Sequence, residues 1–258
     1  MIKMKTLYKI LFIAVSVSSL AFSCNKDKDE NNGIKPEVDK LRVKIVPMYE
    51  GNEMTFSDIY ETQEGYRIRF SKLNIILTEV KDGNKKLFES AVYRFENSKV
   101  LTEVEGDYTD FKNLKGVIGV TEEGGNHDDP SARDLEDPLN IMNVSDMHWG
   151  WNTGYIYAMI EGRVDTTGTA GADLNAVFLY HPGRTFLLQE FELEDIVWEK
   201  VGDKMHETTW YLDMEKLFDS ANVIDIKSER TSHTDPVPEQ EELSMKIMEN
   251  LKEAFRSK

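Results

Sequence analysis

The sequence predicts an all-β protein, mainly an antiparallel β-sandwich, with a short helix and a C-terminal amphipathic helix. From Leu41 onward, most apolar segments alternate with polar residues in the period of two that half-buried strands require. Turn-forming residues such as Asp82, Gly83 and Asn84 separate these segments. No ten-residue helices alternate with the strands, as a parallel sheet with helical crossovers would need, so two packed antiparallel sheets are expected.

The expected strands follow one another along most of the chain. Each is a short apolar or alternating segment bounded by polar or turn-forming residues. They cover residues 41–45, 66–70, 75–77, 86–95, 114–120, 155–164, 176–180, 185–193, 197–201, 208–212 and 223–226.

Two segments are predicted to be helical. Asp213 can cap a short helix over residues 214–220. Residues 238–256 form the better-supported helix, because their apolar side chains recur with helical spacing and make one stripe. That stripe consists of Leu243, Ile247, Met248, Leu251, Ala254 and Phe255. We expect it to pack on its own domain.

Composition and charge limit the function. The 258 residues fit one globular domain, and the 47 acidic residues outnumber the 31 basic ones, for a formal charge of −16. Such a surface repels phosphate backbones, so no nucleic-acid partner is expected, and cationic partners such as metal ions are favoured. No nucleophile elbow, phosphate loop or zinc-protease motif occurs, and we therefore do not expect an enzyme.

The N-terminus predicts delivery to a membrane surface. Residues 1–23 have the basic start and short apolar run of a signal peptide, and the only cysteine, Cys24, follows them at a site that resembles a bacterial lipobox. Lipidation of Cys24 would anchor the protein to the outer membrane and leave it without a thiol. An ordinary secretory signal with an incidental cysteine is the alternative.

Residues 24–39 are predicted to be a flexible tether that leads into the domain of residues 40–258. The tether begins with lysines and acids and lacks apolar side chains at its start. This start also resembles the export tag of surface lipoproteins from Bacteroidetes-type bacteria. The sequence leaves open whether the anchored domain faces the cell surface or the periplasm.

An acidic, glycine-containing loop spans residues 122–137. Its carboxylates are the oxygen ligands that calcium prefers. The regular spacing of an EF-hand is missing, so a solvated loop is favoured over a calcium site.

The segment around Trp149 and Trp151 is unusual, because it combines two tryptophans with Met147, His148 and Tyr155. In an extended segment the two indoles would face one side and His148 the other. This segment resembles the signature of the MbnP family of secreted proteins, in which a Met-x-Trp-x-Trp-Asn-x-Gly-Tyr sequence precedes a strand that ends in Glu-Gly. Further similarity lies in residues 70–77, 116–121 and 180–183, and in residues 232–233 followed by the helix of residues 245–255.

The resemblance implies a β-rich domain outside the cytoplasm. Some MbnP proteins bind copper through histidines near an oxidised tryptophan, and members of the family often sit beside a di-haem peroxidase-like partner. For this chain it implies His181 as the first candidate copper ligand, His233 as the second and His148 as the third. Trp149 and Trp151 are the candidates for oxidation or for a position next to the metal.

The residues themselves leave other possibilities open. Imidazoles suit copper, but zinc uses the same ligands, and the spacing of His148, His181 and His233 is no local metal motif. The aromatic segment could instead fill the core, as we expect for Trp198 and Trp210, or bind a glycan or a partner protein on a metal-free surface. His127 and His206 both look solvated.

Overall fold

The computed structural model describes residues 38–258 except 151–152, 170, 172 and 234–237. The predicted signal peptide, Cys24 and Trp151 lie outside the described residues. No helix in the described part of the chain is long and apolar enough to cross a membrane.

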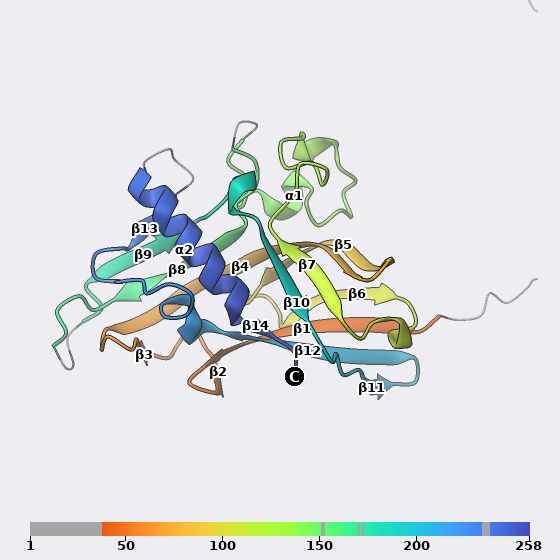
Figure 1. Ribbon diagram of the computed structural model, residues 1–258, viewed down its shortest axis with the longest axis horizontal. Coiled ribbons are helices and arrows are strands. Elements are labelled where there is room, and N and C mark those ends of the chain that lie inside the picture. The colour runs from red at the N-terminus through yellow and green to blue at the C-terminus, as the bar shows by residue number, and fades with distance from the viewer. Residues whose placement is uncertain (1–37, 151–152, 170, 172, 234–237) are drawn as a thin grey trace, which may run out of the picture. The chain divides into compact units, whose positions relative to one another are not determined.

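The chain from Val38 onward is one compact unit built mainly from strands, in agreement with the predicted fold class. It forms two mixed β-sheets (Figure 1). The six-stranded sheet consists of β1 (Lys40–Tyr49), β2 (Asn52–Glu53), β6 (Val100–Glu105), β11 (Glu199–Gly202), β12 (Met205–Asp213) and β14 (Phe255–Arg256).

The eight-stranded sheet carries the candidate site. Its strand order is β10-β7-β4-β8-β9-β13, and β3 and β5 also pair with β4. The strands are β3 (Tyr60–Glu61), β4 (Arg67–Asp82), β5 (Lys85–Arg94), β7 (Leu114–Ile118), β8 (Ala158–Val164), β9 (Ala176–Tyr180), β10 (Gln189–Leu193) and β13 (Thr231–Ser232).

Two strand pairs are parallel, which the sequence did not suggest. β1 pairs with β12, and β9 pairs with β13. Neither pair is joined by a single helical crossover, since long stretches of chain containing other strands separate their members. The parallel pairing therefore arises without the βαβ pattern, and the sandwich remains mainly antiparallel.

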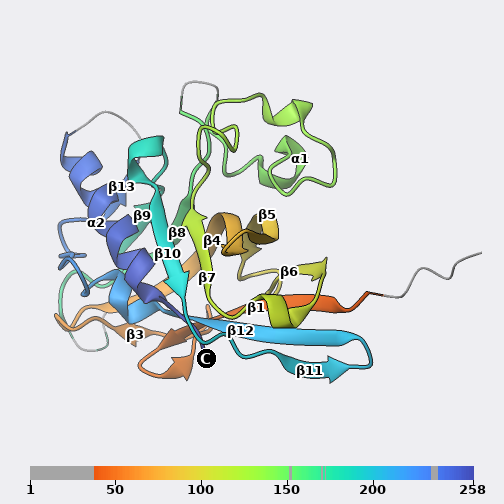
Figure 2. The same ribbon diagram turned by 45° about the vertical axis from the view of Figure 1, so that its right-hand side comes forward.

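Helices cover parts of this framework. Besides α1 (Ile141–Val144) and α2 (Pro238–Ala254), short 3-10 turns lie at Tyr108–Asp110, Pro130–Ala132, Thr185–Leu187 and Met214–Leu217. The apolar stripe of α2 is buried, as predicted, and α2 runs beside β10 and β13 (Figure 2). The predicted helix after Asp213 is only the last of these 3-10 turns. Asp213 stands at its N-cap position, but the side chain makes no capping hydrogen bond and instead accepts one from Arg256 Nε at 2.9 Å.

Several predicted strands have different bounds. Residues 66–70 and 75–77 belong to the single long strand β4, and residues 185–187 form a 3-10 turn before β10. Residues 223–226 form no strand, although Val223 makes one isolated bridge with Asp219. The strand β6 and the helix α1 were not predicted.

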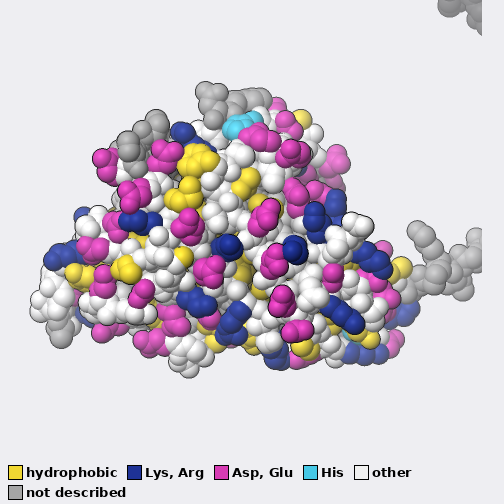
Figure 3. Space-filling view, in the orientation of Figure 1, with side chains coloured by type: hydrophobic (Ala, Val, Ile, Leu, Met, Phe, Trp, Pro, Cys, Tyr) yellow, Lys and Arg dark blue, Asp and Glu magenta, His cyan; other side chains and the backbone are white. Residues whose placement is uncertain are grey.

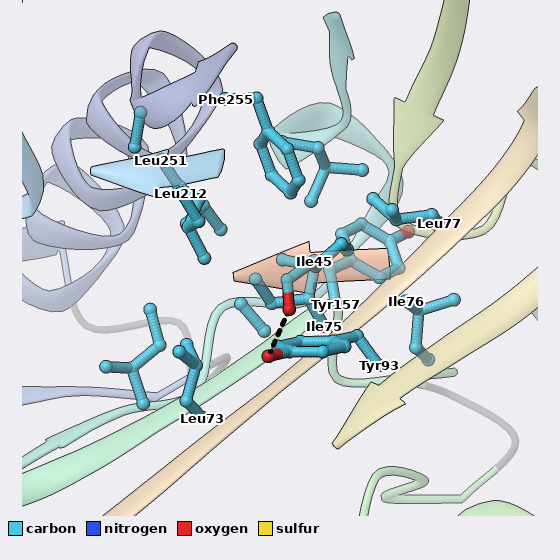
Figure 4. Packing of buried hydrophobic residues seen from close by; sticks show 14 of the residues in the cluster. Ile45, Leu73, Ile75, Ile76, Leu77, Tyr93, Tyr157, Leu212, Leu251 and Phe255 are labelled. Carbon is cyan, nitrogen blue, oxygen red and sulfur yellow. Dashed lines mark hydrogen bonds between the residues drawn. The ribbon is translucent and has the colours of Figure 1, made fainter. Parts of the chain in front are cut away.

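The core lies between the two sheets and under α2. Tyr93 from β5 is buried among aliphatic side chains, and its hydroxyl donates a hydrogen bond to the Ile45 carbonyl of β1 at 3.0 Å (Figure 4). This bond joins one sheet to the other. Trp210 is fully buried, as expected, and Trp198 is partly buried with its Nε1 donating to the Phe111 carbonyl.

Gly162 in β8 is a position that tolerates no side chain. A Cβ placed there would lie 2.3 Å from the Arg69 carbonyl oxygen and 2.4 Å from the Phe178 ring. We expect Gly162→Ala to lower the free energy of unfolding by about 2–4 kcal/mol, because two paired strands must separate to admit the methyl group. Urea unfolding measures this. Gly202→Ala, at an exposed strand end, is the control, and an equal effect of both substitutions would contradict the interpretation.

Candidate metal centre

The pairing of β9 with β13 brings two distant histidines together. Tyr180 is in register with Ser232 on the parallel strand, so His181 and His233 follow at the same level. The His181 backbone N–H donates to the Ser232 carbonyl at 2.8 Å and extends this register. The two imidazole rings are 5.3 Å apart between centroids and nearly perpendicular, with an interplanar angle of 78°.

Glu161 on β8 orients one of the two rings. It pairs with Leu179 across the strands, and its side chain therefore shares a face with His181, two residues further along β9. The distance from His181 Nε2 to Glu161 Oε1 is 2.9 Å. We assign the proton to Nε2, because a carboxylate is an acceptor, and this tautomer leaves the Nδ1 lone pair free.

The other nitrogen of His181 is buried without a partner. Neither Nδ1 of His181 nor Nδ1 of His233 has a hydrogen-bond partner among the described residues, although both atoms are buried. Burial lowers the pKa of His181, and the nearby His233 and Lys72 lower it further, while the Glu161 carboxylate opposes this change. His181 is therefore mainly neutral at neutral pH, the state in which an imidazole can bind a metal.

Trp149 lies against both histidines. Its ring centroid is 5.3 Å from that of His233 and 6.2 Å from that of His181. Its backbone N–H donates a hydrogen bond to the Gly154 carbonyl at 3.1 Å. The indole remains 41% exposed and thus covers one side of the histidine pair while facing solvent on the other.

An ion pair and a buried methionine anchor the segment that leads to Trp149. Arg94 on β5 binds both carboxylate oxygens of Asp146, at 2.9 and 2.7 Å, and donates to the Asn143 carbonyl at 2.9 Å. Met147 is fully buried, and its carbonyl accepts a hydrogen bond from the Ile156 N–H. The residues that precede the exposed indole are therefore tied to β5 and to the core.

His148 points elsewhere, as the predicted alternation with Trp149 requires. Its ring packs edge-on against Tyr155 at 4.9 Å, and its Nδ1 accepts from the Gly150 N–H at 3.3 Å. Among the described residues, His148 has no ring contact with the other histidines. The structure thus brings together two of the three predicted histidines and one of the two tryptophans, and Trp151 lies outside the described residues.

The described residues contain no cluster of three or more His, Cys, Asp or Glu side chains arranged to hold a metal ion. In the acidic loop, several carboxylates instead bind protein groups. Asp129 accepts hydrogen bonds from Ser131, Asp137 binds Arg133, and Glu122 binds His127 and Thr185. Acidic side chains of this loop contribute to the negative surface at the upper right of Figure 3.

The two remaining histidines differ from each other. His127 is exposed, as expected. The expectation for His206 was wrong, because this residue is only 9% exposed and stacks on Tyr108 at 4.0 Å. The sequence offered no sign of this stacking, since Tyr108 belongs to a distant turn.

Two residues of the site were not predicted. Glu161 belongs to the Glu-Gly pair at the end of the family signature, and that position was the available signal. Arg184 lines a small hollow beside His233, Ser244 and Phe186. Its backbone has φ 92° and ψ 143°, a region that normally only glycine adopts, and its Nε is buried without a partner.

Comparisons with known proteins identify the family of the chain. A family model described as MbnP matches residues 38–237. Among solved structures, the chain is similar to MbnP from Methylosinus trichosporium, with 13% sequence identity and a TM-score of 0.44, over 78% of this chain and 82% of that chain. No curated protein matches the chain.

The backbone of Arg184 gives a prediction about strain. We expect Arg184→Gly to have a free energy of unfolding about 1–2 kcal/mol higher than Arg184→Ala, because only glycine relieves the positive φ angle while both variants lose the side chain. Urea unfolding of both variants measures the difference. Equal stabilities would show that the backbone at this position carries no strain.

His148 gives a prediction about pH. Burial lowers its pKa below the ordinary value of 6.5, and Asp129 partly opposes this. Below pH 6.5 the unfolded chain therefore binds a proton that the folded protein does not, and stability falls as the pH decreases. His148→Asn keeps an acceptor for the Gly150 N–H but cannot titrate.

We expect the variant to lose less stability than the original protein between pH 7.5 and 5.5, by up to about 1 kcal/mol. Urea unfolding at the two pH values measures both losses. Parallel pH profiles would contradict the assignment of a neutral, buried His148.

Proposed function

Because the chain belongs to the MbnP family, we propose that it binds and handles copper outside the cytoplasm, with His181 and His233 as ligands beside Trp149. One observation carries the proposal: two imidazoles lie 5.3 Å apart, and each has a buried Nδ1 that bonds to no described residue. Buried polar atoms normally have partners, so an unpaired nitrogen on each of two neighbouring rings is consistent with a shared ligand.

The spacing and the donor types fit a transition metal. With metal–nitrogen bonds of about 2.0 Å, two rings that share one ion have centroids about 5–6 Å apart. Neutral imidazoles suit copper and zinc, whereas calcium and magnesium prefer oxygen. When bound, copper would supply redox chemistry or would be the cargo itself.

Glu161 acts on His181 as a positioning residue. Metal-binding histidines commonly donate their second ring N–H to a carboxylate, which fixes the tautomer and makes the ligating nitrogen more basic. The His181 Nε2 contact with Glu161 has this form, at 2.9 Å. Lowering of the His181 pKa by burial also reduces competition from protons.

Location and partner belong to the same proposal. A lipid anchor on Cys24 would hold the domain at the outer membrane, and a di-haem peroxidase-like protein is the partner implied by the family. The exposed side of Trp149 offers a surface for such a partner. The same exposure favours the alternative, a metal-free module in which the indole binds a glycan.

Copper retention after dialysis tests the proposal. We expect the purified protein to retain copper and His181→Ala and His233→Ala to lose it, because each removes one of two ligands. Glu161→Gln should weaken binding about 10–100-fold, since it removes only the charge behind His181. His127→Ala, which removes an exposed histidine, should bind like the original protein.

Melting temperatures confirm that the variants are folded. The proposed site would be refuted if both histidine variants retained as much copper as the original protein. A protein that retains no copper but binds a glycan, with binding lost in Trp149→Ala, would favour the metal-free module. Stronger retention of zinc than of copper would change the identity of the metal while keeping the site.

A further inference from the structure

A hollow on the eight-stranded sheet gathers three arginines on this acidic protein. It has a volume of about 430 Å³ and is lined by Arg67, Arg69 and Arg163, together with Ile59, Leu174 and Asp173. This volume lies within the range of small-molecule sites, about 300–1,000 Å³. The metal site does not use any of these residues.

The strand register forces two of the guanidinium groups together. Arg69 on β4 and Arg163 on β8 are directly paired across the antiparallel strands, and Arg67 lies two residues before Arg69 on the same face. Their neighbours Ile68, Phe70 and Val164 point into the core and are buried. Like charges directly opposite each other on paired strands are destabilising, so this arrangement has a cost unless an anion lies between them.

Several arginines elsewhere in the described chain have acidic partners, whereas no acidic partner of Arg69 or Arg163 lies among the described residues. Arg42 binds Glu103, Arg94 binds Asp146, and Arg256 binds Asp213. The side chain of Arg69 makes no hydrogen bond or ion pair with any described residue. The Arg163 Nε donates to the Leu174 carbonyl at 2.9 Å, which fixes the guanidinium and leaves its terminal nitrogens available.

The charge of the hollow is positive despite the acidic surface around it. Asp173 is the one acid among its lining residues in the described part of the chain, against three arginines. Asp165, which lies near Arg67, has an oxygen that accepts hydrogen bonds from the Thr167 N–H at 2.9 Å and hydroxyl at 2.6 Å. The hollow therefore attracts anions, whereas the protein as a whole repels them.

We propose that this hollow binds a small soluble molecule that carries a phosphate or sulfate group. The planar guanidinium groups of Arg69 and Arg163 can each donate two parallel hydrogen bonds to a tetrahedral oxyanion. Ile59 and Leu174 offer apolar surface to the remainder of the molecule. A lipid headgroup would present the same kind of oxyanion, and the vesicle measurement below distinguishes it from a soluble ligand.

Calorimetric titration with inorganic pyrophosphate and with sulfate at low ionic strength tests this proposal. We expect binding by the original protein and at least about tenfold weaker binding by Arg69→Gln and by Arg163→Gln, since each loses charge-assisted hydrogen bonds. Arg42→Gln is the matched control, because it removes a guanidinium from the other sheet. It should bind both anions like the original protein.

Melting temperatures provide a second measurement. Pyrophosphate should raise the melting temperature of the original protein and of Arg42→Gln. It should raise the melting temperatures of Arg69→Gln and Arg163→Gln much less. Equal weakening by all three substitutions would show a general charge effect and overturn the proposal, as would the absence of binding. In another outcome, the protein binds phosphatidylcholine vesicles only when they contain phosphatidylglycerol and does not bind pyrophosphate. That result would overturn the proposal of a soluble ligand. Copper is absent from these experiments, so their outcome is independent of the metal site.

Discussion

Strand β4 is the constraint on which the described structure depends, because it pairs with β3, β5, β7 and β8 along its 16 residues. The pairing of β4 with β8 shifts register between Phe70 and Lys72, and its pairing with β7 shifts register between Thr78 and Lys81. Residues 73–78 are all buried, whereas residues 67–71 alternate between buried and more exposed. The middle of β4 therefore lies in the core, whereas the start of the strand has one buried face and one face toward solvent.

The histidine pair follows from this framework by successive registers. β4 fixes β8, β8 fixes β9, and β9 pairs in parallel with the two residues of β13. A one-residue slip between β8 and β9 would turn Glu161 and His181 to opposite faces of the sheet. The geometry of the pair therefore depends on hydrogen bonds far from the rings. Arg94 adds the third element, since its ion pair with Asp146 anchors the segment that carries Trp149.

Local patterns in the sequence predicted the strands well and the site only in part. Alternation identified the β-rich class and the bounds of β9, and helical spacing identified the buried stripe of α2, because each of these patterns depends on residues close together in the sequence. The joining of residues 66–70 and 75–77 into β4 was missed, since a bulge interrupts the alternation there. His181 and His233 were chosen through family resemblance, and no local pattern pairs them. The opposition of Arg69 and Arg163 was also invisible, because it depends on a register between strands far apart in the sequence.

The metal-site proposal and the arginine hollow share one face of one strand. Glu161 and Arg163 are two residues apart on β8, which separates their Cα atoms by about 7 Å. The residue between them, Gly162, lets β4 and Phe178 approach so closely that no side chain fits. The carboxylate that favours a metal at His181 and the guanidinium that favours an anion near Arg69 are thus fixed by the same backbone. A rigid strand can keep such opposite charges apart, whereas a flexible loop would let them pair and cancel.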